Sequence, residues 1–161
     1  MEPEYRRFNV ALFLLATLIL GSIVINAFTS RHPWALTCYQ CKACSLKCPL
    51  GYDVSVYVAA AATDNPDLYM SASNLQLTLG EAYRTDPNMV VEVYGDNKKM
   101  TSGEAYTRYS NDTIVWARKL RVKDAAKFDP LCGACDSMCP INLPITNIIR
   151  DLKEDGKFGN G

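Results

Sequence analysis

The residues best suited to chemistry are seven cysteines, which fall in two groups separated by residues 49–131, a stretch without any cysteine. The groups are Cys38, Cys41, Cys44 and Cys48, and then Cys132, Cys135 and Cys139. An odd number of cysteines cannot all pair as disulfides, and gaps of two and three residues suit metal ligation better than a disulfide framework. The sequence therefore predicts that these thiolates bind metal.

The first group has the spacing of the bacterial ferredoxin run, Cys-x2-Cys-x2-Cys-x3-Cys followed by Pro49. The two-residue gaps let one tight loop present three thiolates to three irons of a single [4Fe–4S] cluster. The fourth cysteine of such a run ligates the other cluster of the pair. A zinc site would need sets of four tetrahedral ligands, and this run does not divide that way. We therefore predict iron–sulfur clusters.

The second group matches the same run with Asp129 in place of its first cysteine, and it ends at Pro140. Crossed ligation then predicts two clusters. Cluster one is a [4Fe–4S] cluster held by Cys38, Cys41, Cys44 and Cys139. Cluster two is held by Cys48, Cys132 and Cys135, with Asp129 in the remaining position.

Several interpretations of Asp129 stay open. Cluster two is a [4Fe–4S] cluster with Asp129 as an oxygen ligand, or a [3Fe–4S] cluster, or a four-iron cluster with water or a partner's group on the fourth iron. In the purely structural interpretation, Asp129 is a turn or helix-capping residue before Pro130.

An uncharged apolar run, Phe8–Phe28, precedes the cysteines and is long enough to cross a bilayer as a helix. Arg6 and Arg7 come before it, and Arg31 and Trp34 follow, as suits the headgroup region. The run is longer than the usual core of a cleaved signal peptide, so we expect a membrane anchor in contact with lipid.

The orientation of this anchor follows less directly from the sequence, because basic residues flank both ends of the run. The pair Arg6-Arg7 also resembles a twin-arginine export signal, although the surrounding residues fit that signal loosely. We expect a single pass through the cell membrane with the cluster domain on the cytoplasmic side.

The remaining pattern favours helices. We expect one over residues 54–62 after Asp53, starts at Thr78 and Thr101 from their Thr-x-x-Glu spacing, and a final helix over 145–152. A helix is also expected over 104–127, with a break near 110–112, and a short strand within 89–94. The predicted fold class is mostly α: an anchor (1–30), then a helical ferredoxin domain (31–161) with a long helical insertion at about 63–127.

Composition excludes several other functions. Lysine and arginine together number 17, as do aspartate and glutamate, which argues against a nucleic-acid partner. The chain has one histidine, His32, so it cannot supply two histidines to a haem, and it lacks a nucleotide-binding glycine loop. His32 lies at the predicted membrane boundary, where an interfacial role is expected rather than metal ligation.

The two cysteine groups and the segment Cys139–Arg150 resemble the helical dicluster ferredoxin family, above all the C subunit of heterodisulfide reductase. The iron–sulfur subunits of succinate dehydrogenase and fumarate reductase are more distantly similar. The resemblance covers residues 37–57 and 128–153. Asp129 replaces a cysteine that the family usually has, and the apolar N-terminal run is an addition, which fits a related membrane-bound respiratory complex.

The resemblance implies an electron-transfer subunit, not a complete enzyme. Its partners would be a catalytic subunit and a membrane quinone-binding or cytochrome b subunit, with the insertion as the expected contact region. Two alternatives from other classes are an assembly subunit whose clusters mainly stabilise the fold, and an enzyme that binds substrate at an open iron near Asp129.

Overall fold

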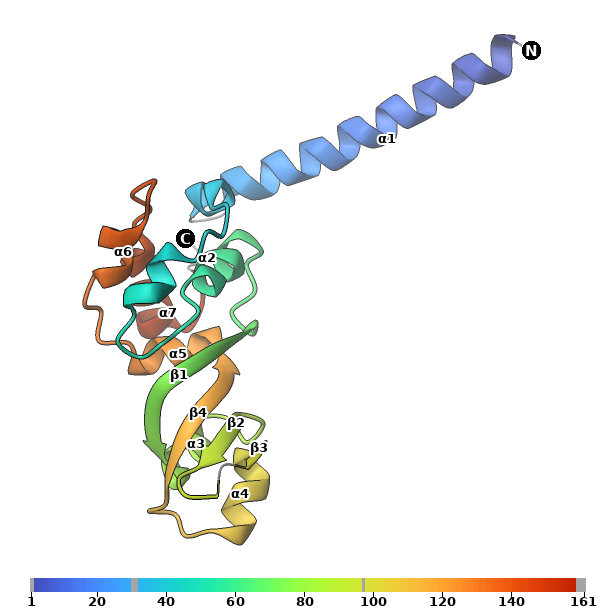
Figure 1. Cartoon of the computed structure of the whole chain (residues 1–161). Coiled ribbons are helices and arrows are strands. Elements are labelled where there is room, and N and C mark those ends of the chain that lie inside the picture. The colour runs from blue at the N-terminus through green and yellow to red at the C-terminus, as the bar shows by residue number, and fades with distance from the viewer. Residues whose placement is uncertain (1, 30–31, 97, 159–161) are drawn as a thin grey trace.

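The computed structural model describes residues 2–29, 32–96 and 98–158, and side chains of the first range from 8 to 25. Figure 1 shows a long N-terminal helix that leads away from a body in which a helical part adjoins a four-stranded sheet. About 51% of the chain is helical. The predicted fold class is therefore right about the apolar helix and the helical character, but it misses the sheet.

The N-terminal helix α1 (Glu2–Thr29) contains an apolar segment that does not pack into the rest of the protein. Its segment Phe8–Ile25 has a mean hydropathy of 2.5, and none of it is buried against the rest of the chain. The Thr17 and Ser22 hydroxyls donate to the carbonyls of Phe13 and Ile19, at 2.8 and 2.7 Å, so these polar groups are satisfied within the helix. By length and composition α1 could cross a membrane, although a signal sequence has the same features.

Of the charged residues predicted to flank the apolar run, Arg6 and Arg7 lie within α1 with side chains outside the described part, and Arg31 lies outside the described residues. The predicted orientation across a membrane therefore stays a prediction.

The helical module consists of six short elements that come from both ends of the sequence. They are the 3-10 turns η1 (Pro33–Thr37) and η2 (Ala43–Lys47), and the helices α2 (Ser55–Ala62), α5 (Val122–Phe128), α6 (Ala134–Met138) and α7 (Ile145–Asp155). Helix α2 packs against η1 and α7, while α6 packs against η2. Tyr57, Val58, Ile148 and Leu152 lie in the core of this module. The helices predicted over 54–62 and 145–152 are confirmed as α2 and α7.

The insertion is mainly a sheet, contrary to the predicted helical insertion. Its strands are β1 (Tyr69–Thr78), β2 (Val90–Val93), β3 (Lys99–Thr101) and β4 (Ile114–Arg121), in the order β1-β4-β2-β3 with antiparallel neighbours. Helices α3 (Leu79–Thr85) and α4 (Ser102–Arg108) connect the strands. The predicted strand within 89–94 is confirmed as β2. The predicted helix starts are confirmed too, since the Thr78 and Thr101 hydroxyls accept from the amides of Glu81 and Glu104.

The helix predicted over 104–127, with a break near 110–112, is confirmed only in part. Helices α4 and α5 cover its two ends and the break is present, but residues 114–121 form strand β4 instead. Val115, Ala117 and Leu120 are buried in the core from strand β4, whereas Ile114 is 52% exposed. The pairing of β4 with both β1 and β2 is irregular, with a register shift in each ladder. These bulges break the strict alternation that would have indicated a strand in the sequence.

Strand β1 joins the sheet directly to the turn that follows Cys48. The amide of Asp53 donates to Ser71 O at 3.1 Å, and the amide of Ser73 donates to Gly51 O at 3.2 Å. Gly51 has φ +64°, and a Cβ there would lie 1.8 Å from Ser73 Oγ. Only glycine therefore allows this close approach between the cysteine segment and the sheet.

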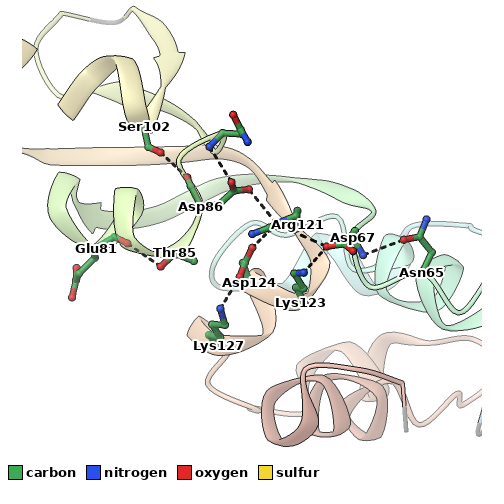
Figure 2. A network of polar contacts seen from close by, with 11 residues as sticks. Asn65, Asp67, Glu81, Thr85, Asp86, Ser102, Arg121, Lys123, Asp124 and Lys127 are labelled. Carbon is green, nitrogen blue, oxygen red and sulfur yellow. Dashed lines mark hydrogen bonds and ion pairs between the residues drawn. The ribbon is translucent and has the colours of Figure 1, made fainter. Parts of the chain in front are cut away.

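A network of buried charges lies where β4 passes into α5 (Figure 2). Arg121 Nε lies 2.8 Å from Asp124 Oδ2 and 3.2 Å from Asp86 Oδ2, so one guanidinium neutralises two carboxylates. The Asp124 and Asp86 side chains are only 1% and 3% exposed. Lys127 Nζ also contacts Asp124, at 2.7 Å. This network holds the α3–β2 turn of the sheet against α5 of the helical module.

We predict that Arg121→Met lowers the free energy of unfolding by about 2–4 kcal/mol, because it leaves Asp86 buried without its counter-charge. Chemical denaturation of the anaerobically prepared protein measures this. The matched control is Arg108→Met, which removes an exposed pair with Glu104 on α4 and should cost about 0.5 kcal/mol or less. Equal effects of the two variants would contradict a stabilising role of the buried network.

Candidate metal centres

The structure places the seven cysteines around two pockets, and each pocket takes cysteines from both groups. The first pocket is lined by Cys38, Cys41 and Cys44 together with Cys139 from the second group, and has about 320 Å³ of empty space, part of which is open to solvent. All seven cysteines lie in the described part of the chain, and all are free thiols. Cys139 reaches this pocket because α6, which precedes it, packs against η2.

The second pocket is lined by Cys132 and Cys135 together with Cys48 from the first group, and by Asp129. Its empty space is about 330 Å³, again partly open to solvent, so the two pockets are of similar size. The residues predicted for each cluster are thus brought together around one pocket each.

The loops that carry the two groups have the same backbone conformation. Gln40 and Lys42 are left-handed, with φ 54° and 61°, and so are Leu131 and Gly133 at the matching positions, with φ 53° and 70°. These turns on either side of Cys41 and Cys132 direct successive thiols toward one side of the loop. Residues other than glycine and asparagine adopt this conformation rarely, so its recurrence in both loops marks a shared requirement.

The likeness extends to both ends of the loops. Cys38 has φ −70° and ψ 119°, and Asp129 has φ −69° and ψ 128°. Cys48 and Cys139 match as well, with φ −68° and −74° and ψ 119° and 118°. Asp129 therefore occupies in the second loop the backbone position that Cys38 occupies in the first.

Burial determines the ionisation of the inner cysteines. It raises the pKa of the Cys44 and Cys48 thiols, and it raises that of Cys135 to about 11. These thiols are therefore protonated at neutral pH unless a positive charge lies beside them. Thiolate is the form that binds metal, and a bound cation is what lowers the pKa of a ligating thiol.

Polar contacts of Asp53, called a clamp below, connect two elements at the first pocket. Asp53 Oδ1 accepts hydrogen bonds from Ser55 Oγ at 2.6 Å and from Ser45 Oγ at 3.3 Å, and Lys42 Nζ lies 3.0 Å from Asp53 Oδ2. Because Ser45 belongs to η2 and Ser55 to α2, the clamp fixes the Cys44 turn relative to α2.

An aspartate also connects two elements at the second pocket, but here it lies on α6, within the cysteine run, instead of before the helix that follows the run. Asp136 Oδ1 accepts from the amide of Thr146 at 2.8 Å, which ties α6 to the start of α7. The Thr146 hydroxyl lies 3.8 Å from Cys135 Sγ. Ser55 and Thr146 line their respective pockets at matching positions. Sequence reasoning missed both residues, although each follows the third cysteine position of its run at the same spacing.

Asp129 is buried, with 7% of its surface exposed, and its Oδ1 accepts from the amide of Leu131 at 2.8 Å. Burial raises the pKa of its carboxyl group; the Leu131 amide and the charge of Lys153 oppose this effect. Lys153 Nζ also donates to the Asp129 carbonyl at 2.7 Å. The carboxyl group therefore lies at the wall of the second pocket and is held by a turn.

A second aspartate, Asp86, makes the same kind of side-chain hydrogen bond to the amide two residues later and lines neither pocket. Asp86 ends α3 before Pro87, as Asp129 ends α5 before Pro130, and its Oδ1 accepts from the amide of Asn88 at 2.9 Å. A structural role thus accounts for the turn at Asp129. Only its position in the wall of the second pocket, at the backbone site of Cys38, points to a ligand.

His32 makes a polar contact with helix α7, as an interfacial structural role would allow. It is buried after the end of α1, and its Nε2 lies 3.0 Å from Asp151 Oδ2 on α7. Its ring also meets the edge of Trp34. The contact fixes the segment between α1 and Cys38 against the C-terminal helix.

In the described part of the chain, no three or more histidine, cysteine, aspartate or glutamate side chains lie close enough together to hold a single metal ion.

The chain matches no protein-family model, no curated protein and no solved structure among those compared.

We predict that Asp129→Asn converts cluster two to a three-iron cluster, because the amide still accepts from Leu131 but is a much weaker ligand than a carboxylate. Asp129→Cys completes the cysteine run and should retain four irons. Electron paramagnetic resonance of the oxidised proteins distinguishes the outcomes, since a [3Fe–4S] signal should appear in the Asn variant alone.

Asp86→Asn is the matched control, because it changes the same kind of turn outside both pockets and should leave the cluster spectra unaltered. If Asp129→Asn also kept the wild-type spectrum and iron content, Asp129 would be a turn residue only.

Proposed function

We propose that this protein is a membrane-anchored electron-transfer subunit that holds two iron–sulfur clusters by crossed ligation. Cys38, Cys41, Cys44 and Cys139 would hold cluster one, and Cys48, Cys132, Cys135 and Asp129 would hold cluster two. The observation that carries this proposal is that each of two pockets is lined by thiols from both cysteine groups.

The donor set fits such a cofactor better than a single metal ion. A zinc ion needs four ligands within about 2.3 Å of one point, and the described side chains do not converge in that way. In a cluster each thiolate binds a different iron, so its ligands surround a volume instead of a point. The two pockets of about 320 and 330 Å³, each walled by thiols, are consistent with that requirement.

When bound, such clusters take up and release single electrons without breaking bonds. The protein's contribution is to hold them, to keep water away and to place them next to each other. Pro49, Val54 and Ile149 line the second pocket, and Ile141, Leu143 and Ile145 line the first, so apolar side chains complete both walls.

The crossing keeps the two sites adjacent. The run of Cys44 and Cys48 through η2 supplies one thiol to each pocket, and the run of Cys135 and Cys139 through α6 does the same. An electron could therefore pass between neighbouring sites without leaving the helical module.

The apolar helix α1 supports a membrane location for this module. Its exposed side chains would be in water in a soluble protein, whereas lipid would bury them. The turn η1 packs against α1 and leads directly to Cys38, so the first pocket follows the membrane segment closely in the chain. We propose a single-pass anchor with the clusters on the cytoplasmic side.

The proposed partners are those of the helical dicluster ferredoxin family, which the cysteine runs resemble. A catalytic subunit would stand at one end of the electron path and a quinone-binding or cytochrome b subunit at the other. The sheet of the insertion is the expected contact region with one of them, because it adds a separate surface to a module that already contains both pockets.

We predict that the full chain, purified anaerobically from membranes, contains about eight irons and two interacting [4Fe–4S] centres on reduction. Iron and sulfide analysis with electron paramagnetic resonance measures this. Intact-mass spectrometry of the same sample checks that α1 has not been cleaved. Zinc in place of iron, or absence of metal, would contradict the proposal. Reduction potentials that no membrane electron carrier can reach would instead favour clusters that only stabilise the fold.

A further inference from the structure

Thr146, in the first turn of α7, is a buried polar residue in the wall of the second pocket. Its hydroxyl oxygen lies 3.8 Å from Cys135 Sγ, which is within hydrogen-bonding distance for sulfur. Its backbone amide donates to Asp136 Oδ1 at 2.8 Å. The main chain of Thr146 is therefore fixed, and its hydroxyl contacts the sulfur of a predicted ligand of cluster two.

The direction of this hydrogen bond follows from the chemistry of ligation. Between a free thiol and a hydroxyl, either atom could be the donor. A cysteine that binds metal does so as a thiolate, which has no proton, so only the Thr146 hydroxyl can then donate. Asp136 Oδ1 also lies 3.7 Å from Cys135 Sγ, but an ionised carboxylate has no proton to give. Of these two neighbours, Thr146 alone can stabilise the Cys135 thiolate by a hydrogen bond.

The first pocket has a hydroxyl at the matching position, but it bonds elsewhere. Ser55 follows Cys44 at the interval at which Thr146 follows Cys135, and it lines the first pocket. Its hydroxyl donates to Asp53 Oδ1 at 2.6 Å. The Ser45 hydroxyl, next to Cys44, donates to the same carboxylate oxygen at 3.3 Å. Asp53 thus takes up the hydroxyls that lie near the Cys44 turn.

One residue accounts for this difference between the two sites. The position that Asp53 has before α2 belongs to Pro144 before α7, since each lies five residues after the last cysteine of its run. A proline side chain offers no acceptor, so nothing at this position draws the Thr146 hydroxyl away from Cys135. The two halves of the helical module, which are alike in their loops, therefore direct their matching hydroxyls to different acceptors.

We propose that Thr146 is a positioning residue whose hydroxyl donates a hydrogen bond to the Cys135 thiolate and raises the reduction potential of cluster two. The inference rests on the proposed function. Hydrogen bonds to the sulfurs of a cluster are among the factors that set its potential. A donor stabilises the reduced form, which carries one more negative charge. One electron enters the cluster from the reductant and the proton stays on the Thr146 oxygen, so no bond is formed or broken.

The test is a potentiometric titration of the full chain, followed by electron paramagnetic resonance, with wild-type protein and Thr146→Val, which keeps the side-chain shape without the hydroxyl. Loss of the donor should shift the cluster-two equilibrium toward the oxidised form by about two- to tenfold. For a one-electron couple this lowers the midpoint potential by about 18–59 mV. The cluster-one potential should stay unchanged, and Thr146→Ser, which keeps a hydroxyl, should restore the wild-type value. The cluster-two signal is the one that Cys132→Ala alters.

Ser55→Ala is the matched control, because it removes the hydroxyl at the same position of the first pocket and should leave the cluster-two potential unchanged. If Thr146→Val does not retain iron, Thr146→Ala is titrated in its place with the same expected shift. An unchanged cluster-two potential, an equal shift in Ser55→Ala, or loss of iron from both Thr146 variants would overturn the inference. Absence of iron in the wild-type protein would instead refute the proposed function.

Discussion

Neither cysteine loop can enclose a pocket alone, and this constraint organises the helical module. Each loop directs three positions to its own pocket and sends its last cysteine, Cys48 or Cys139, to the other. The left-handed turns around Cys41 and Cys132 make this possible, because they bring nearby thiols to one side of a short loop. The packing of α6 on η2 then follows, since the two segments must lie side by side for the last cysteines to cross.

The sheet is connected to the first cysteine loop through hydrogen bonds of β1. The turn after Cys48 contains Gly51, whose carbonyl accepts from the amide of Ser73, so the cysteine segment continues directly into the sheet edge. At the other end of the insertion, Arg121 neutralises Asp86 and Asp124 and fixes the start of α5, which ends at Asp129. The insertion thus supports both loops, although its strands contribute no cysteine.

Much of the candidate site could be predicted from the sequence, because ligand spacing is a local property. The intervals between cysteines were enough to assign Cys139 to the first pocket and Asp129 to the second. Helix starts were equally local: Thr78 and Thr101 cap α3 and α4 through residues three positions away. The strands were harder, because the pairing of β1 with β4 joins residues far apart in the sequence, and bulges obscure the alternation along both strands.

Two features of the site lay beyond sequence reasoning for physical reasons. Ser55 and Thr146 have matching positions, yet their hydroxyls have different partners, which no local pattern encodes. The position of Asp129 in the wall of the second pocket became visible only in the structure, because Asp86 makes the same kind of side-chain to amide hydrogen bond outside both pockets. A turn residue and a ligand have the same sequence signature, and three-dimensional context separates them.

Crossed ligation can be tested with one set of cysteine variants. Cys41→Ala and Cys132→Ala each remove a ligand that belongs to one pocket only, so Mössbauer and electron paramagnetic resonance spectra of these variants assign the two clusters. With crossed ligation, Cys48→Ala perturbs the cluster that Cys132→Ala perturbs, and Cys139→Ala perturbs the one assigned by Cys41→Ala. If Cys48→Ala instead perturbed the same cluster as Cys41→Ala, each loop would serve its own site and crossed ligation would be wrong.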